Sequence, residues 1–346
     1  MDYQQKNMSV LVTGATGFIA QHIVNDLLKQ GYKVIGTVRS EDKGKKLKSQ
    51  FGNNDLLEME VVPDIAQPRA FDDIFKKYSS EIKVVLHTAS PFHFRATDYE
   101  KELLIPAIQG TKGLLQSIME FGSQTVEHVV ITSSIAAIKD TYRFLEKDLV
   151  YTEDNWNPIS WSESQLNPQD AYRGSKNFAE KAAWDFLQHN KGLIKLNLTT
   201  INPALIFGPQ LFAENITGTL NTSAEVINSF LQSMPDRDIT NIRGDFVDVR
   251  DVSKAHLLAF QNEEAIGKRL GLSAGQFNGQ DLAEILNRRF QQLRGVIPPC
   301  TSEGAYKIQP YAKFDNSKTK EILGFEFITL EKSLCDTAAQ ILKKEY

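Results

Sequence analysis

The stretch Val12-Thr13-Gly14-Ala15-Thr16-Gly17-Phe18-Ile19-Ala20 decides the fold, because it joins an apolar run to a helix through a glycine turn. Residues 8–13 (MSVLVT) predict a short buried strand, and the apolar stripe that follows Gly17 predicts a helix. Helix N-termini bind pyrophosphate through backbone N–H groups and the helix dipole, and glycine lets the phosphate come close. The stretch therefore predicts a dinucleotide site. The spacing Gly-x-x-Gly-x-x-Ala is looser than Gly-x-Gly-x-x-Gly, and the alternative is a turn with only a structural purpose.

Outward from this stretch, apolar runs and helical patterns alternate along the chain. Further strands are expected at 33–38, 57–62, 84–87, 128–131 and 196–201, and a helix over about 98–121 should kink at Pro106. Such alternation predicts an α/β fold of the Rossmann type, a doubly wound parallel sheet with ligands at the strands' carboxyl ends. We expect the nucleotide-binding domain to comprise 1–209 with 246–266. A smaller, discontinuous substrate lobe should comprise 210–245 with 267–346.

Composition narrows the class of protein. A chain of 346 residues can form one large domain or two intimate ones, and its net charge of -4 argues against a nucleic-acid partner. Its two cysteines, Cys300 and Cys335, lack metal-ligand spacing, so no metal is expected. The first residues contain no apolar signal core, and no apolar stretch is long enough to span a membrane. We expect a cytoplasmic protein with a small-molecule substrate, either a monomer or a homodimer.

Residues after the second, third and fourth strands suggest which dinucleotide is bound. Arg39 and Lys43 suit the 2′-phosphate of NADPH, although Glu41 and Asp42 lie between them and a solvated helix start is the alternative. Asp64 could accept a hydrogen bond from the adenine amino group or cap a helix over 68–78. The small side chains after the fourth strand would let a cofactor ribose lie against the loop; they are Thr88, Ala89 and Ser90.

Tyr172 and Lys176 lie four residues apart in a helical run, so they share one face. A nearby ammonium group lowers the pKa of a tyrosine, which can then protonate a carbonyl oxygen. The alternative is an amphipathic helix with a half-buried tyrosine and a solvated lysine. Ser134, after the fifth strand, would add a second donor to that oxygen, unless it only bonds its own backbone. Ser133 is the other candidate, and only one of the two should face the site.

Apolar residues after strand ends suggest a substrate pocket. We expect Phe92, Phe94, Ile135 and Leu205 to line it beside Tyr172, with plain core packing as the alternative for each. The polar loop 140–167 carries aromatic residues and is long for a connection, which is typical of a lid or pocket wall.

Together these motifs resemble the extended short-chain dehydrogenases/reductases, in particular their dihydroflavonol-4-reductase-like branch with the yeast NADPH-dependent methylglyoxal reductases and related carbonyl reductases. The resemblance runs nearly end to end. Besides the glycine turn and the basic pair, it rests on segments listed here in chain order: 87–91 (HTASP), 132–134 (TSS), 172–181 (YRGSKNFAEK), 202–203 (NP), 207–209 (FGP) and 246–256 (FVDVRDVSKAH).

The resemblance implies a role for each matching residue. Tyr172 would be the proton donor, Lys176 would lower its pKa and hold the nicotinamide ribose, and Ser134 would align the carbonyl. The pyrophosphate would lie against Gly14, Ala15, Thr16, Gly17, Phe18 and Ile19. Arg39 and Lys43 would bind the 2′-phosphate, and Asp64 with Ile65 the adenine. Near the nicotinamide, the family pattern implies Ile206, Phe207, Gly208, Pro209 and Ser223.

The activity so implied is NADPH-dependent reduction of aldehydes and ketones, including methylglyoxal, other α-dicarbonyls and branched or aryl carbonyls. The alternatives are an epimerase or a steroid dehydrogenase on the same scaffold, and an NADPH-sensing module without enzymatic activity. Three departures stand out. Residues 105–107 (IPA) replace the region in which many members carry a proton-relaying asparagine, Ala20 replaces a third glycine, and Arg173 should lie off the catalytic face and matter little.

Overall fold

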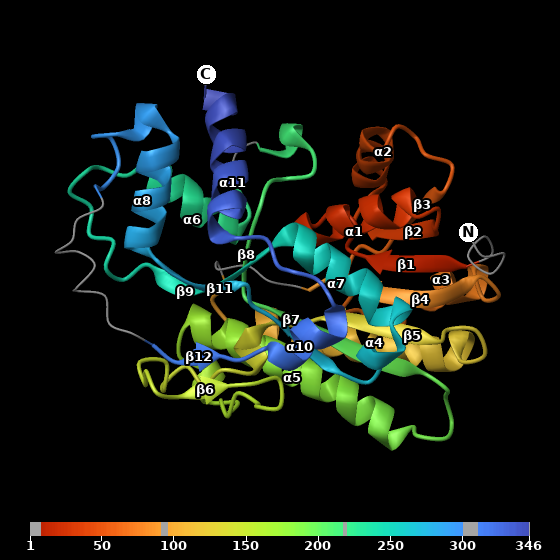
Figure 1. Ribbon diagram of the computed structural model, residues 1–346. Coiled ribbons are helices and arrows are strands. Elements are labelled where there is room, and N and C mark those ends of the chain that lie inside the picture. Colours follow the sequence, from red (N-terminus) through yellow and green to blue (C-terminus); the bar gives the residue numbers. More distant parts are fainter. Residues whose placement is uncertain (1–7, 91–95, 217–219, 300–310, 346) are drawn as a thin grey trace. The chain divides into compact units, whose positions relative to one another are not determined.

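The computed structural model describes residues 8–90, 96–216, 220–299 and 311–345. Contacts divide the chain into two units (Figure 1). The first comprises Met1–Thr141, Glu153–Asn202 and Ser253–Leu270, and the second Tyr142–Thr152, Pro203–Val252 and Gly271–Tyr346. These bounds differ from the domain bounds expected from the sequence at residues 142–152, 203–209, 246–252 and 267–270.

The first unit is built on a seven-stranded sheet. Its strand order is β10 (Arg269–Leu272), β7 (Asn197–Pro203), β5 (His128–Thr132), β4 (Ile82–His87), β1 (Ser9–Thr13), β2 (Lys33–Val38) and β3 (Leu57–Val61). The pairs from β7 through β3 are all parallel, which confirms the predicted parallel sheet. The strand order reverses between β1 and β4, and in such sheets ligands bind outside the carboxyl ends at that point.

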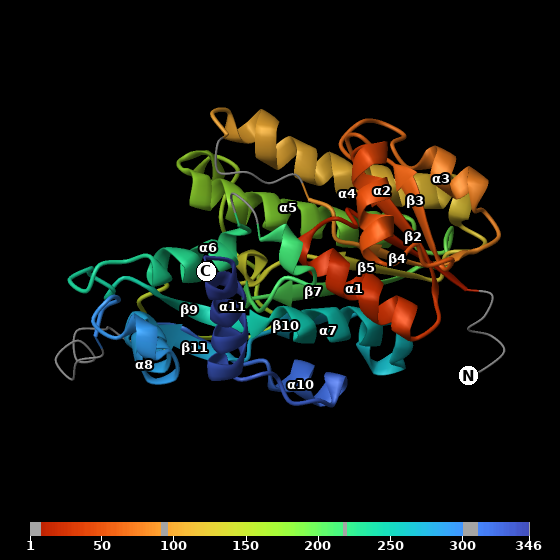
Figure 2. The same ribbon diagram turned by 90° about the horizontal axis from the view of Figure 1, so that it is seen from above.

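Helices cover both faces of this sheet, as a doubly wound fold requires. α3 (Asp72–Lys77), α4 (Ile105–Ser117) and α5 (Pro168–His189) lie on one face, and α4 and α5 run side by side (Figure 2). The other face carries α1 (Phe18–Lys29) and the part of α7 (Val249–Gln261) from Ser253 onward. There the Ser253 hydroxyl donates a hydrogen bond to Asp26 over 2.6 Å. α2 (Glu41–Gln50) links β2 to β3.

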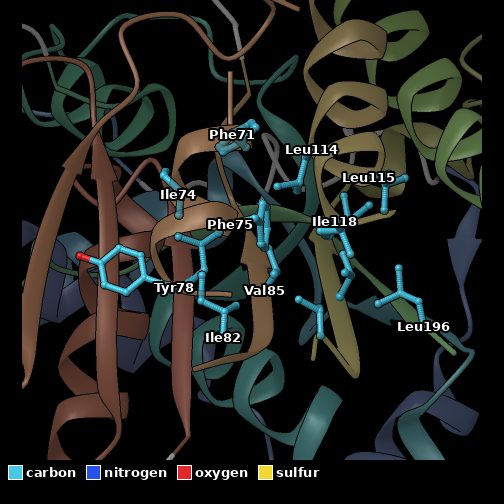
Figure 3. Close-up of a cluster of buried hydrophobic side chains, with 14 of the residues drawn as sticks. Phe71, Ile74, Phe75, Tyr78, Ile82, Val85, Leu114, Leu115, Ile118 and Leu196 are labelled. Carbon is cyan, nitrogen blue, oxygen red and sulfur yellow. The ribbon is translucent and has the colours of Figure 1, made fainter. Parts of the chain in front are cut away.

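A cluster of buried apolar side chains fills the space between the sheet and α3 and α4 (Figure 3). Phe71 and Phe75 meet Leu114 and Ile118 there, and all four are at most 1% exposed. A polar contact also joins these two helices: the Ser117 hydroxyl on α4 donates to the buried Asp72 carboxylate on α3 over 2.7 Å. Burial of such side chains is the main stabilising term, worth roughly 1.5–3 kcal/mol for each large apolar group.

The helix expected over 98–121 consists of three pieces. α4 is flanked by two π-helical turns, η2 (Glu100–Leu104) and η3 (Ile118–Gly122). Pro106 lies in the first turn of α4, where a missing backbone N–H does little harm. Hydrogen bonding thus changes from π-helical to α-helical just before Pro106, and the kink expected there stays a prediction.

The second unit contains two small sheets and four α-helices among its described residues. One sheet orders β11 (Gly275–Asn278), β9 (Arg243–Asp248) and β8 (Leu205–Phe207), and the other pairs β12 (Lys313–Phe314) with β6 (Val150–Tyr151). The helices are α6 (Thr222–Leu231), α8 (Gly279–Arg289), α10 (Ser317–Leu323) and α11 (Leu330–Glu345). Three aromatic rings pack together in its core: Phe207 and Phe246 stack, and Phe277 meets both of them edge to face.

Over the described ranges of the chain, no helix is long and apolar enough to cross a membrane. The same residues include no group of three His, Cys, Asp or Glu side chains that could hold a metal ion.

Candidate active site and cofactor cleft

The glycine turn is held against the loop that follows β4. Gly14 has a φ of +68°, and a Cβ there would lie 3.1 Å from Ala89, so both its backbone and its surroundings favour glycine. Gly17 is the N-cap of α1, and its N–H donates to the Gly14 carbonyl over 2.8 Å. Even a Cβ on Gly17 would be 3.9 Å from that of Ala20, so alanine is accommodated at the position of the third glycine.

Thr13 links the ends of β1 and β4. Its backbone carbonyl accepts a hydrogen bond from the Thr88 hydroxyl over 2.5 Å, and its own hydroxyl accepts from the Ala89 N–H over 3.1 Å. The Thr13 hydroxyl also bonds Nδ1 of His87 over 2.8 Å. Burial lowers the pKa of His87 to about 3, with the charge of Lys176 acting in the same direction, so the imidazole is neutral at ordinary pH.

A cavity of about 410 Å³ opens beside this turn. Ten of the predicted cofactor residues line it, namely Gly14, Thr16, Gly17, Arg39, Lys43, Asp64, Ile65, Thr88, Ala89 and Ser90. The cavity therefore offers glycine N–H groups at one place and two cations at another, as a 2′-phosphorylated dinucleotide requires. Four further lining residues were not expected from the sequence, and they stand at the ends of β2 and β3: Thr37, Val38, Val62 and Pro63.

The other predicted pyrophosphate residues surround the turn. Ala15 is fully buried, its N–H donates to the Thr37 carbonyl over 2.8 Å, and Phe18 and Ile19 begin α1.

Asp64 closes a local turn. Its carboxylate accepts hydrogen bonds from the Ala66 N–H and the Gln67 side chain, each over 2.9 Å. These bonds, followed by the charge of Arg39, lower its pKa. The expected cap of a helix over 68–78 is wrong, because α3 begins at Asp72 with Phe71 as its N-cap. Contact with adenine stays a prediction.

Tyr172 lies near the start of α5, which begins at Pro168 with Asn167 as its N-cap. The Ser134 side chain is hydrogen-bonded to Tyr172. Burial raises the pKa of Tyr172, while the bond to Ser134 and the charge of Arg173 act in the opposite direction. The Arg173 guanidinium pairs with Asp170 at 3.3 Å, and the expectation that Arg173 matters little to catalysis stays a prediction.

The two neighbouring serines have different partners. Ser134 caps the 3₁₀ turn η4 (Ile135–Ala137) by accepting from the Ala136 N–H over 3.1 Å, in addition to its bond with Tyr172. The backbone bond expected of a turn serine is therefore present, and donation from Ser134 to a substrate carbonyl stays a prediction. Ser133 points elsewhere, because its hydroxyl donates to Glu180 over 2.5 Å.

Lys176 reaches the end of β5, where its ammonium group donates to the Thr132 carbonyl over 3.3 Å. Burial lowers its pKa to about 8, and the charge of Glu180 opposes that shift. Lys176 also lines a second, smaller cavity of about 20 Å³, together with His87, Ser90, Thr111 and Glu180.

The part of the long loop that belongs to the first unit packs on α5. Trp161 contacts the Phe178 ring at a centroid distance of 5.2 Å and donates from Nε1 to Glu100 over 3.0 Å. Ser164 is fully buried, and a Cβ on Gly174 would lie only 2.2 Å from its hydroxyl oxygen. Glycine in the Tyr-Arg-Gly-Ser-Lys segment thus allows the loop to approach α5 closely, a requirement that the sequence pattern did not reveal.

The remaining predicted residues divide into three groups. Ile135 is partly buried and directly follows Ser134. Leu205, Ile206, Phe207, Gly208, Pro209 and Ser223 belong to the second unit; Leu205 packs on its core and the Gly208 N–H donates to Thr337 over 3.1 Å. Phe92 and Phe94 lie outside the described residues.

Comparisons with known proteins find similar sequences and structures among NADPH-dependent reductases. The sequence profile of the 3-beta hydroxysteroid dehydrogenase/isomerase family matches residues 11–273. The chain is 50% identical over 339 residues to the NADPH-dependent methylglyoxal reductase of Saccharomyces cerevisiae, covering 98% of this chain and 99% of that protein. The crystal structure of a yeast methylglyoxal/isovaleraldehyde reductase with NADPH is similar at a TM-score of 0.95 and 50% identity, over 98% and 99% of the two chains. A related NADPH complex from Candida albicans gives 0.94 and 49%, over 98% and 100%.

Proposed function

We propose that this chain is an NADPH-dependent carbonyl reductase. The premise is its family: the chain belongs to the 3-beta hydroxysteroid dehydrogenase/isomerase family of extended short-chain dehydrogenases/reductases. One observation carries this proposal. Ser134 is bonded to Tyr172 at the carboxyl edge of the parallel sheet, and Lys176 ends at the same edge. The sequence relatives are named as methylglyoxal reductases, and methylglyoxal is therefore the first substrate to test.

The residues of the larger cavity fit NADPH. Gly14 and Gly17 leave room for a pyrophosphate against the N-terminus of α1, and Arg39 with Lys43 supplies two cations for a 2′-phosphate. Asp64 and Ile65 line the same cavity, where adenine would lie. When bound, NADPH supplies the hydride that reduces the carbonyl carbon.

Tyr172 and Ser134 then serve the carbonyl oxygen. Because burial raises its pKa, Tyr172 keeps its proton at neutral pH and can donate it as negative charge develops on the oxygen. The Ser134 hydroxyl, already bonded to Tyr172, provides a second donor for that oxygen. Lys176 places a positive charge on the same face of α5 and stabilises the phenolate that remains.

Initial rates of NADPH oxidation test this proposal, with methylglyoxal, isovaleraldehyde and an aryl ketone as substrates and NADH in parallel. We expect Tyr172→Phe to lower kcat by about 100-fold or more while NADPH binding is unchanged, because only the donated proton is lost. Tyr142→Phe is the matched control, since Tyr142 is 61% exposed and lies in the second unit.

Two other outcomes would contradict the proposal. Tight NADPH binding with no turnover of any carbonyl would favour a sensing module. Cofactor that stays bound through purification, with turnover of a nucleotide sugar, would favour an epimerase.

We also propose that the enzyme is cytoplasmic and is a monomer or homodimer, with a nucleotide-binding domain at 1–209 with 246–266 and a substrate lobe at 210–245 with 267–346. Light scattering after gel filtration measures the oligomeric state, and a fluorescent fusion reports the location. Substrate range in Leu205→Ala and Ile135→Ala tests whether these two residues line the substrate pocket.

A further inference from the structure

One buried charge near Lys176 has no part in the mechanism above. Glu180 lies one helical turn after Lys176 on α5, and it is only 1% exposed. Removing a carboxylate from water is costly unless hydrogen bonds and an opposite charge compensate. The carboxylate of a buried glutamate on the catalytic helix is therefore expected to have several hydrogen-bond donors and a positive charge around it.

The Glu180 carboxylate is held by five donors. Oε2 accepts from the Ser133 hydroxyl at 2.5 Å and from Asn202 Nδ2 at 2.7 Å. Oε1 accepts from Arg269 Nε at 2.5 Å, with longer bonds from Thr200 at 3.2 Å and Trp184 at 3.4 Å. Ser133 directly follows β5, Thr200 and Asn202 lie on β7, Arg269 begins β10 and Trp184 lies on α5 itself. The negative charge is consequently fixed in position by three strands of the sheet.

Glu180 and Lys176 also form part of the wall of one cavity. Its volume of about 20 Å³ holds one water molecule, and polar side chains of Ser90, Thr111 and Ser133 line it too. A water molecule there has the hydrogen-bonding partners that it needs, and it can lie between the ammonium and the carboxylate.

The other charged and titratable groups around this pair can be named. On β4, His87 is neutral; on α7, His256 bonds the Thr132 hydroxyl at 2.7 Å. On α5, Tyr172 precedes Lys176 by one turn, with Arg173 beside it, and the Lys181 ammonium lies over the Trp156 ring at 5.4 Å. On β10, Arg269 pairs with Glu180, and the loop before α5 contributes the buried Glu153.

We propose that Glu180 is the fixed negative partner of Lys176: through the shared cavity it holds the ammonium in its charged form, and it is thereby a positioning residue for proton donation by Tyr172. This inference rests on the proposed reductase function. Because Lys176 must be charged to stabilise the phenolate, loss of the Glu180 charge moves the alkaline fall in kcat/KM for carbonyl reduction to lower pH. The expected shift is about one pH unit, the lower end for an opposite charge within a few ångströms.

A pair of variants separates this electrostatic role from a structural one. Glu180→Gln and Arg269→Gln break the same ion pair, and each loosens the loop that Arg269 holds through the carbonyls of Glu153 and Asn155. Their effects on Lys176 have opposite signs. Glu180→Gln removes a negative charge and shifts the alkaline limb to lower pH, whereas Arg269→Gln leaves the carboxylate uncompensated and shifts the limb to higher pH.

The test combines two measurements on wild type and both variants. The first is the pH profile of kcat/KM for methylglyoxal at saturating NADPH. The second is the titration of the Lys176 ε-carbon resonance in protein with ¹³C-labelled lysine, assigned by its absence in Lys176→Arg. Opposite shifts of the lysine titration in the two variants support the proposal, and unchanged or parallel shifts overturn it.

The second measurement needs no turnover, so it decides the inference even if wild type reduces no carbonyl and the proposed function fails. If Glu180→Gln does not fold, Glu180→Asp replaces it, because aspartate keeps the negative charge but withdraws it by one methylene from the shared cavity. A downward shift of the Lys176 titration in Glu180→Asp supports the counter-charge, and any other result overturns it.

Discussion

The close approach of the loop to α5 makes a sharp prediction for Gly174→Ala. In an open helix this substitution stabilises, because alanine is favoured over glycine by about 1 kcal/mol. Here the new Cβ would lie 2.2 Å from the Ser164 hydroxyl oxygen and 2.5 Å from its Cβ. Ser164 is fully buried and its hydroxyl donates to the Ser160 carbonyl over 2.8 Å, so it cannot simply rotate into solvent.

The magnitude follows from the two opposing effects. An overlap of more than an ångström in a packed interior costs about 1–3 kcal/mol, and occasionally more, because backbone must shift. Subtracting the gain of about 1 kcal/mol in helix propensity leaves a net loss of up to about 2 kcal/mol in the free energy of unfolding. A shift of α5 also displaces Tyr172 and Lys176, so we expect kcat to fall with stability.

Urea unfolding followed by tryptophan fluorescence is the assay. The chain has three tryptophans, and all of them lie in the first unit: Trp156 and Trp161 in the loop and Trp184 on α5. Gly113→Ala is the matched control, because Gly113 is a glycine of the neighbouring helix α4 with no atom within 4 Å of a new Cβ. That variant should gain about 0.5–1 kcal/mol.

A double variant tests the cause. Ser164→Gly removes the two nearest atoms and leaves Leu104 Cδ2 at 3.2 Å, so Ser164→Gly with Gly174→Ala should recover at least about 1 kcal/mol relative to the sum of the single changes. If Gly174→Ala is as stable as Gly113→Ala, or if the two changes are additive, the close packing of Ser164 on α5 is refuted.

Two further predictions concern the cofactor cleft and the buried imidazole. Arg39→Gln should lower kcat/KM for NADPH by about tenfold to a hundredfold, through loss of charge-assisted hydrogen bonds to the 2′-phosphate, and leave NADH little affected; parallel losses for both cofactors would contradict this role. His87 has a pKa of about 3 in the folded protein, whereas its ordinary pKa is 6.5. Between these two pH values the unfolded chain carries a proton on this imidazole that the folded chain does not, so a lower pH favours unfolding. Stability should therefore fall with decreasing pH, by up to about 1.4 kcal/mol per unit, and His87→Gln should remove that slope in urea unfolding. Equal slopes in both proteins would refute the assignment to His87.

Six of the seven strands could be predicted because each has a strong local signal, whereas β10 lies in a range that was expected to belong to the substrate lobe. Central parallel strands are buried on both faces, so all five residues of β1 are buried and the centre of β4 is the apolar run Val84-Val85-Leu86. The glycine turn could also be predicted from the sequence, because a positive φ and a close neighbour both restrict position 14 to glycine. Carboxyl ends of parallel strands meet at one edge, which is why Thr88, Ala89 and Ser90 were expected near the turn.

The strands of the second unit were harder to predict from the sequence because they are short. β8 has three residues and β6 and β12 have two each, too few for an alternating pattern to emerge. The function of Asp64 was ambiguous for a related reason. A carboxylate after a strand can cap a helix or close a turn, and only the position of α3 distinguishes these.

On the catalytic helix, residue spacing predicts which side chains share a face but not where that face lies. The i, i+4 rule places Tyr172 and Lys176 on one face, but it does not fix that face in space. Three contacts made by other parts of the fold do so: Ser134 bonds Tyr172, Ser164 packs against Gly174, and Ser133 with Arg269 holds Glu180. The three positions lie within about two turns of α5, and their partners come from the end of β5, the loop before α5 and β10. Proton donation needs atoms placed to within about half an ångström, and these distant partners, which no local pattern specifies, supply that placement.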